Sequence, residues 1–169
     1  LGFHDKKERK DSYNIALVQT ALLPDERDYH YGKESRFVHP YLQWFLIVNH
    51  LKHHSDKHLD LIVFPESTLP FGAHTKVFSF DDMAPTMEGE LGNLSSFLVE
   101  PFAENREGKW YVNNSFWAQA LADHYQAELV IGLDSEEGKD HYNAAFHFSP
   151  YGKRKVTRYE KRVLLPLAE

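Results

Sequence analysis

Short β-rich runs and one-sided helical stripes alternate along the first part of the chain. The run NIALVQT at residues 14–20 has the apolar, β-branched composition of a strand. Apolar positions within residues 37–51 then recur at steps of four and three, which indicates an amphipathic helix that we expect to end near Lys57. Pro40 is compatible with this helix only in its first turn.

The same alternation continues in two later segments. LDLIVF at residues 59–64 is almost continuously aliphatic, as in strands that are buried on both faces of a sheet, and AELVIGLD at residues 127–134 repeats this character. Between them, Asn113 or Asn114 is a suitable N-cap for a helix that runs to about Gln126. The chain therefore begins as a β-α-β unit and adds a further helix and strand.

The remaining segments predict a hairpin and an insertion. Two β-rich runs at residues 142–148 and 153–160 flank a proline-and-glycine turn at residues 149–152, and we expect Asn143 to hold this turn. Residues 72–112 are interrupted by glycine and proline, so we expect an insertion over one face of the sheet with one short helix. The whole pattern predicts an α/β layered domain, in which ligands bind outside the carboxyl ends of strands.

Composition narrows the class of protein. With 169 residues, 42% of them hydrophobic, the chain has the size of one domain with a real core. Its net charge of −6 argues against a general nucleic-acid binder. The longest apolar stretch, at residues 44–48, is far shorter than the roughly 20 residues that span a bilayer, so we expect the chain itself to be soluble. Residues 1–13 have the composition of a solvated linker.

The absence of cysteine limits the possible chemistry. Disulfides, zinc-thiolate sites and a cysteine nucleophile are all excluded within these residues. Four histidines lie at helix-like offsets, at positions 50, 53, 54 and 58, but no carboxylate accompanies them in the register of a zinc-binding helix. We therefore expect an exposed, titratable helix end, and neither a metal nor another cofactor.

Two charged residues stand at predicted strand ends. Glu66 directly follows an apolar run and Pro65, which fixes the point where the strand stops. Lys161 stands just past the last predicted strand. A carboxylate and an ammonium presented in this way are expected to meet in one pocket. The alternatives are that Glu66 only caps the next element and that Lys161 belongs to a solvated basic face.

The segments around these residues resemble a known family. VFPEST at residues 63–68 looks like the glutamate segment of the nitrilase (carbon-nitrogen hydrolase) superfamily, and YEKRVLLPLAE at residues 159–169 is similar to its lysine segment, most closely in the apolipoprotein N-acyltransferases. NIALVQT and YNAAFHFSPYGK are similar to the family's first strand and hairpin. The resemblance implies an α-β-β-α sandwich, present here as the N-terminal portion over residues 14–169 and incomplete because the strands that carry the cysteine are missing.

The resemblance also implies a Glu-Lys-Cys triad. Glu66 matches the general base, Lys161 matches the cation that stabilises the tetrahedral oxyanion, and Glu169 matches a second glutamate that supports the lysine. The nucleophilic cysteine would lie beyond this chain, so we expect the chain alone to be inactive. Because the glutamate-to-lysine separation of 95 residues is long for the family, we assign the surplus to residues 72–112, whose apolar side chains predict a hydrophobic lid.

For the intact protein the resemblance implies lipoprotein biosynthesis. A phospholipid acyl chain would pass through a cysteine thioester to the α-amino group of a lipoprotein's diacylglyceryl-cysteine. The parent would sit in the bacterial inner membrane through preceding transmembrane helices, with this domain on the periplasmic side, and would bind no nucleic acid. Two alternatives stay open, namely a fragment of a soluble nitrilase-like amidase and a cysteine-free, non-enzymatic binding module of the same fold.

Overall fold

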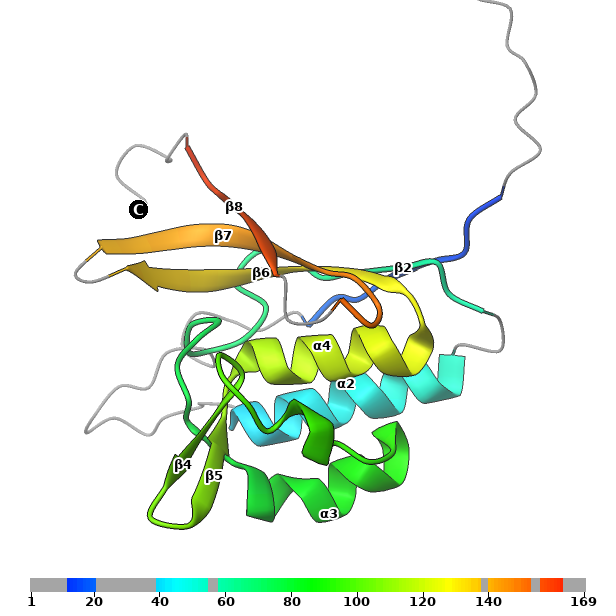
Figure 1. Ribbon diagram of the computed structural model, residues 1–169. Coiled ribbons are helices and arrows are strands. Elements are labelled where there is room, and N and C mark those ends of the chain that lie inside the picture. The colour runs from blue at the N-terminus through cyan, green and yellow to red at the C-terminus, as the bar shows by residue number, and fades with distance from the viewer. Residues whose placement is uncertain (1–11, 21–38, 55–57, 138–139, 153–155, 163–169) are drawn as a thin grey trace, which may run out of the picture.

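The computed structural model describes residues 12–20, 39–54, 58–137, 140–152 and 156–162. Five strands form the main sheet, in the order β1-β2-β6-β7-β8 (Figure 1). Their bounds are β1 Ile15–Leu17, β2 Leu61–Val63, β6 Glu128–Glu137, β7 Asp140–Phe148 and β8 Thr157–Glu160. Strands β1, β2 and β6 are parallel, whereas β6, β7 and β8 pair antiparallel. The predicted α/β class and each predicted strand are confirmed.

Helices lie on one face of this sheet. Helix α2 (Pro40–His54) and helix α4 (Asn114–Tyr125) pack beneath the strands, and Figure 1 shows no helix of the described residues on the opposite face. Trp44 of α2 and Trp117 of α4 are both 0% exposed, so the apolar stripes are buried as predicted. Pro40 is the first residue of α2, where its missing N–H breaks no helical hydrogen bond. Among the described helices, none is long and apolar enough to cross a membrane.

Residues 72–112 hold more regular structure than their sequence predicts. A helix, α3 (Phe80–Leu91), continues through Pro85, and a small antiparallel sheet follows the order β3-β5-β4. The bounds of the other elements are β3 Phe78–Ser79, η1 Ser95–Phe97, β4 Ala103–Arg106 and β5 Lys109–Val112. The single short helix expected here corresponds to η1, and α3 was missed. Proline costs α3 one hydrogen bond, but its apolar side chains are buried against α2 and α4, which offsets that cost.

The hydrophobic-lid prediction is wrong for the apolar side chains of this segment. Phe78, Met87 and Leu94 are between 0% and 4% exposed, because they fill the core between α3, the small sheet and the helices under the main sheet. Figure 1 shows α3 and the β4–β5 hairpin beyond α2 and α4, on the side away from the main sheet. These side chains stabilise the scaffold and do not cover the carboxyl ends of the strands.

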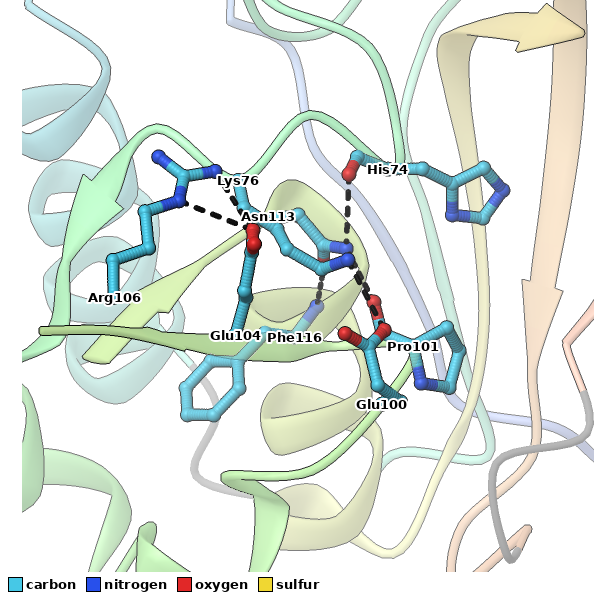
Figure 2. Close-up of polar contacts among 8 residues, drawn as sticks. All are labelled: His74, Lys76, Glu100, Pro101, Glu104, Arg106, Asn113 and Phe116. Carbon is cyan, nitrogen blue, oxygen red and sulfur yellow. Dashed lines mark hydrogen bonds and ion pairs between the residues drawn. The ribbon is translucent and has the colours of Figure 1, made fainter. Parts of the chain in front are cut away.

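The start of α4 connects the small sheet to the loop that follows β2. The Asn113 side chain caps α4 by accepting a hydrogen bond from Phe116 N at 2.9 Å. Its Nδ2 donates to Pro101 O at 2.9 Å and to His74 O at 3.4 Å (Figure 2). The next residue, Asn114, accepts a hydrogen bond from Trp44 Nε1 at 2.9 Å. The predicted N-cap is thus confirmed, and it also links three segments that lie far apart in the sequence.

Replacing Asn113 by alanine is expected to lower the free energy of unfolding by about 1–2 kcal/mol, because the cap is lost and nothing replaces its donors to two loop carbonyls. Urea denaturation of the chain measures this change. Asn93→Ala is the matched control, since the bonds that Asn93 Oδ1 accepts, from Ser95 N at 2.8 Å and from the Ser95 hydroxyl, are local and exposed, and we expect the change to cost about 0.5 kcal/mol or less. Equal losses in the two variants would contradict the role assigned to Asn113.

Candidate active site

Glu66 lies on a turn that is attached to strand β6. Strand β2 ends at Val63, and the turn then occupies residues 65–68. Gly132 N donates to Pro65 O at 3.2 Å, and Thr68 N donates to Gly132 O at 3.0 Å. Because β2 and β6 are parallel neighbours, these bonds place Glu66 at the carboxyl edge of the sheet. The strand-end position predicted for Glu66 is confirmed.

Gly132 is the residue that allows this close approach. A Cβ at position 132 would lie 2.5 Å from Pro65 O and 2.6 Å from Glu66 Cα, both of which are backbone atoms. Any side chain here would push the turn away from β6 and move Glu66. The glycine is therefore part of the geometry of the site.

The substitution Gly132→Ala is expected to destabilise the chain by about 1–3 kcal/mol, as overpacking against backbone usually does. The same change at Gly89 is the control, because a Cβ there meets nothing within 4 Å and the residue is exposed inside α3. Gly89→Ala should stabilise the chain by about 0.5–1 kcal/mol, since alanine favours helix. Thermal unfolding of both variants tests the opposite signs, and a neutral Gly132→Ala would show that the turn is free to move.

Lys161 comes to the same place from the other end of the sequence. It follows β8 directly, and its backbone N donates to Asn143 O of strand β7 at 2.8 Å. Its Nζ lies 3.3 Å from Glu66 Oε1, although the two residues are 95 positions apart in the sequence. The side chain of Lys161 is 28% exposed and that of Glu66 is 56% exposed. The structure thus brings the two predicted residues together as an ion pair that solvent can reach.

The pair borders a cavity of about 330 Å³. The wall of this cavity is largely apolar and comes from the end of β2, from β6, from β7 and from β8. The residues that line it are Phe64, Pro65, Glu66, Val130, Gly132, Asn143, Ala144, Ala145, Tyr159 and Lys161. The expectation of one shared pocket for Glu66 and Lys161 is met, while their chemical roles stay predictions.

Two further sequence predictions fare differently. Asn143 does not hold the hairpin turn, because it lies inside β7, opposite Asp134 of β6, and lines the cavity. The turn between the strands is instead closed by the bond from Gly152 N to Ser149 O at 3.0 Å. Asn143 lies within the strand predicted at residues 142–148 and not next to the turn at residues 149–152, and its place in that strand puts it in the wall of the cavity. Glu169, the third predicted site residue, lies outside the described residues.

The histidines do not gather with carboxylates into a metal site in the described part of the chain, where no group of three or more His, Cys, Asp or Glu could hold a metal ion. His53 Nδ1 lies 2.7 Å from the carbonyl of Asn49, and His58 pairs loosely with Asp60 at 3.7 Å.

The pKa of His74 is lowered mainly by burial of its side chain, and the nearby positive charges of Arg158 and Lys76 lower it further. His74 is therefore neutral at pH 7.

Fold and site together define a class, namely an α/β domain with an acid-base pair at the carboxyl edge of its sheet, beside a mainly apolar cavity. A carboxylate in this position can accept a proton, and an ammonium beside it can stabilise negative charge that develops on a bound oxygen. Such a pair needs a nucleophile to act on a carbonyl compound, and this chain has no cysteine.

Comparison with known proteins identifies the relatives. Apolipoprotein N-acyltransferase of Chlamydia trachomatis serovar D is 34% identical over 66% of this chain and 19% of its own length. The enzyme of the same name from Chlamydia pneumoniae is 29% identical over 98% of this chain and 27% of its own length. That of Chlamydia caviae is 31% identical over 67% and 19%, respectively. No family model matches the chain.

Solved structures of low identity also match the chain. A carbon-nitrogen hydrolase from Helicobacter pylori G27 covers 91% of this chain and 41% of its own, with a TM-score of 0.45 and 18% identity. A CN-hydrolase superfamily protein from Xanthomonas campestris covers 75% and 36%, with a TM-score of 0.44 and 17% identity.

The chain is homologous to the apolipoprotein N-acyltransferases, which confirms the resemblance drawn from its glutamate and lysine segments. It spans between 19% and 27% of the length of these curated relatives.

Proposed function

We propose that this chain is the N-terminal portion of the catalytic domain of an apolipoprotein N-acyltransferase, with Glu66 as general base and Lys161 as the oxyanion-stabilising cation. The observation that carries the proposal is the 3.3 Å contact between Lys161 Nζ and Glu66 Oε1 at the rim of one cavity. The homology to enzymes of that name supports the choice of reaction. In this proposal a cysteine from sequence outside these residues supplies the nucleophile, and the chain alone is inactive.

The first half-reaction loads the cysteine. Its thiol proton passes to the Glu66 carboxylate while the sulfur attacks the ester carbonyl of a phospholipid, and the ammonium of Lys161 faces the oxyanion of the tetrahedral intermediate. Collapse of that intermediate breaks the carbon-oxygen bond to glycerol. The leaving alkoxide takes the proton from Glu66, so that a thioester and a lysophospholipid remain and the carboxylate is regenerated.

The second half-reaction unloads the cysteine. The α-amino group of a diacylglyceryl-cysteine attacks the thioester, Glu66 accepts a proton from the amine, and Lys161 again faces the oxyanion. Collapse breaks the carbon-sulfur bond, and the thiolate recovers the proton from Glu66. The apolar wall formed by Phe64, Val130 and Ala144 suits the first methylenes of an acyl chain. In this proposal the parent protein lies in the bacterial inner membrane with this domain on the periplasmic side, as the resemblance to the apolipoprotein N-acyltransferases implies.

A labelled acyl chain tests the proposal. Purified full-length protein is incubated with phosphatidylethanolamine that carries a labelled acyl group, and intact mass measurement looks for a single acyl adduct that hydroxylamine removes. Addition of a diacylglyceryl-cysteine peptide should move the label to the peptide amine. Transfer of the label only to water would favour a hydrolase of the amidase type, and a protein that is never acylated would favour a non-enzymatic binding module.

A further inference from the structure

The turn that carries Glu66 is closed in an unusual way. In a four-residue turn the backbone N–H of the last residue commonly bonds to the carbonyl of the first. Here the backbone N–H of Thr68 donates instead to Gly132 O at 3.0 Å. The side-chain hydroxyl of Thr68 donates to Pro65 O at 2.6 Å. Thr68 is 0% exposed, so water does not compete for this bond.

The Thr68 hydroxyl donates its hydrogen bond to the peptide group between Pro65 and Glu66. Pro65 O belongs to this peptide unit, and it accepts both the Thr68 hydroxyl and Gly132 N. The next residue, Ser67, has a φ of 50°, in the left-handed region that side chains other than glycine rarely adopt. A turn with such a residue needs neighbouring bonds to keep one conformation. The orientation of the Glu66 backbone therefore depends on the donor that Thr68 supplies.

We propose that Thr68 is a positioning residue for Glu66, which rests on the proposed function of Glu66 as general base. Its hydroxyl keeps the carboxylate within reach of the thiol and beside Lys161. Thr68→Val has almost the same shape but lacks the donor, and it is expected to lower kcat for acyl-enzyme formation by about 10–100-fold, since small misplacements of reacting groups cost this much. KM should stay within about threefold, because Thr68 does not line the cavity.

The test uses the full-length protein and four variants, namely Thr68→Val, Thr68→Ser, Thr68→Ala and Glu66→Gln, with kcat and KM for acyl-enzyme formation from labelled phosphatidylethanolamine. Thr68→Ser retains the hydroxyl and should restore kcat to within about threefold of the unchanged protein. Thr68→Ala removes the donor without adding bulk, and it decides the question if Thr68→Val does not fold. In a Glu66→Gln background, Thr68→Val should cause no further loss, since both changes act on the same group.

The outcomes separate this inference from the function on which it rests. Loss with valine or alanine, recovery with serine and no additional loss in the Glu66→Gln background would support the positioning role. Valine and alanine variants as active as the unchanged protein, in a protein that Glu66→Gln inactivates, would overturn the role of Thr68 alone. A further loss in the Glu66→Gln background would also overturn it, since Thr68 would then act on general stability. Full activity of Glu66→Gln would overturn the proposed function itself.

Discussion

Replacing Glu66 by glutamine in the full-length enzyme is expected to reduce the rate of acyl-enzyme formation by about 10²–10⁴-fold, the usual contribution of a positioned general base. Glutamine keeps the size of the side chain and its place on the turn, but its amide cannot accept the thiol proton. Because the cavity keeps its shape, the loss should fall on kcat, with KM within about threefold of the unchanged enzyme. Single-turnover kinetics with labelled phospholipid measures this effect.

A second ion pair in the molecule offers the control. Lys52 of α2 and Glu90 of α3 pair at 2.6 Å on the side of the helices, with exposed fractions of 57% and 26%. Glu90→Gln also removes a carboxylate that pairs with a lysine, but this pair lies away from the cavity. The variant should therefore leave the rate of acyl-enzyme formation unchanged. If Glu66→Gln were no slower than Glu90→Gln, Glu66 would be a structural partner of Lys161 and not a base.

Removal of the Lys161 charge is the second large effect. Lys161→Met keeps a side chain of similar length but removes the ammonium group. The oxyanion then loses its cation, and the rate of acyl-enzyme formation should fall by about 10²–10³-fold. The folded state should barely change, because exposed ion pairs contribute only about 0.2–1 kcal/mol. Comparing initial rates with urea denaturation curves separates these two consequences.

Lys52→Met is the matched variant for this measurement, since it also breaks an exposed lysine-glutamate pair. It should have the same small effect on stability and no effect on rate. A further variant, Lys161→Arg, keeps the positive charge on a bulkier and planar group, and we expect an intermediate rate. The role of Lys161 would have to be abandoned if Lys161→Met and Lys52→Met were equally active.

The sequence carried much of the fold because its strands and helices obey simple periodicities. The aliphatic run at residues 59–64 and the stripe at residues 37–51 each have one plausible structure, and the structure agrees with both over the residues that it describes. Helix α3 is not predicted from the sequence because Pro85 and Gly89 are residues that usually interrupt helices. In the structure, burial of the apolar side of α3 against other helices outweighs the free-energy cost of these two residues. Tertiary packing of this kind is not visible in a local pattern.

The candidate site was partly visible for a different reason. A charged residue directly after a predicted strand is easily recognised in a sequence, so a contact between Glu66 and Lys161 could be predicted from the sequence alone. Thr68 and Gly132 could not be found in this way, since their importance comes from contacts with the backbone of the turn. The role predicted for Asn143 is wrong although the residue lies in the strand predicted at residues 142–148, because the sequence does not show which residues of a strand line a cavity.

The pairing of β8 with β7 sets which side of the sheet receives the ammonium. Among the described residues, four pairs join β8 to β7, from Ala144–Glu160 to His147–Thr157, and successive side chains along a strand point to opposite faces. A slip by a single residue would turn Lys161 toward the helices and leave Glu66 without its partner. A change in the connection between β7 and β8 that shifted this register by one residue would thus be chemically equivalent to deleting the lysine, although every side chain of the site would still be present.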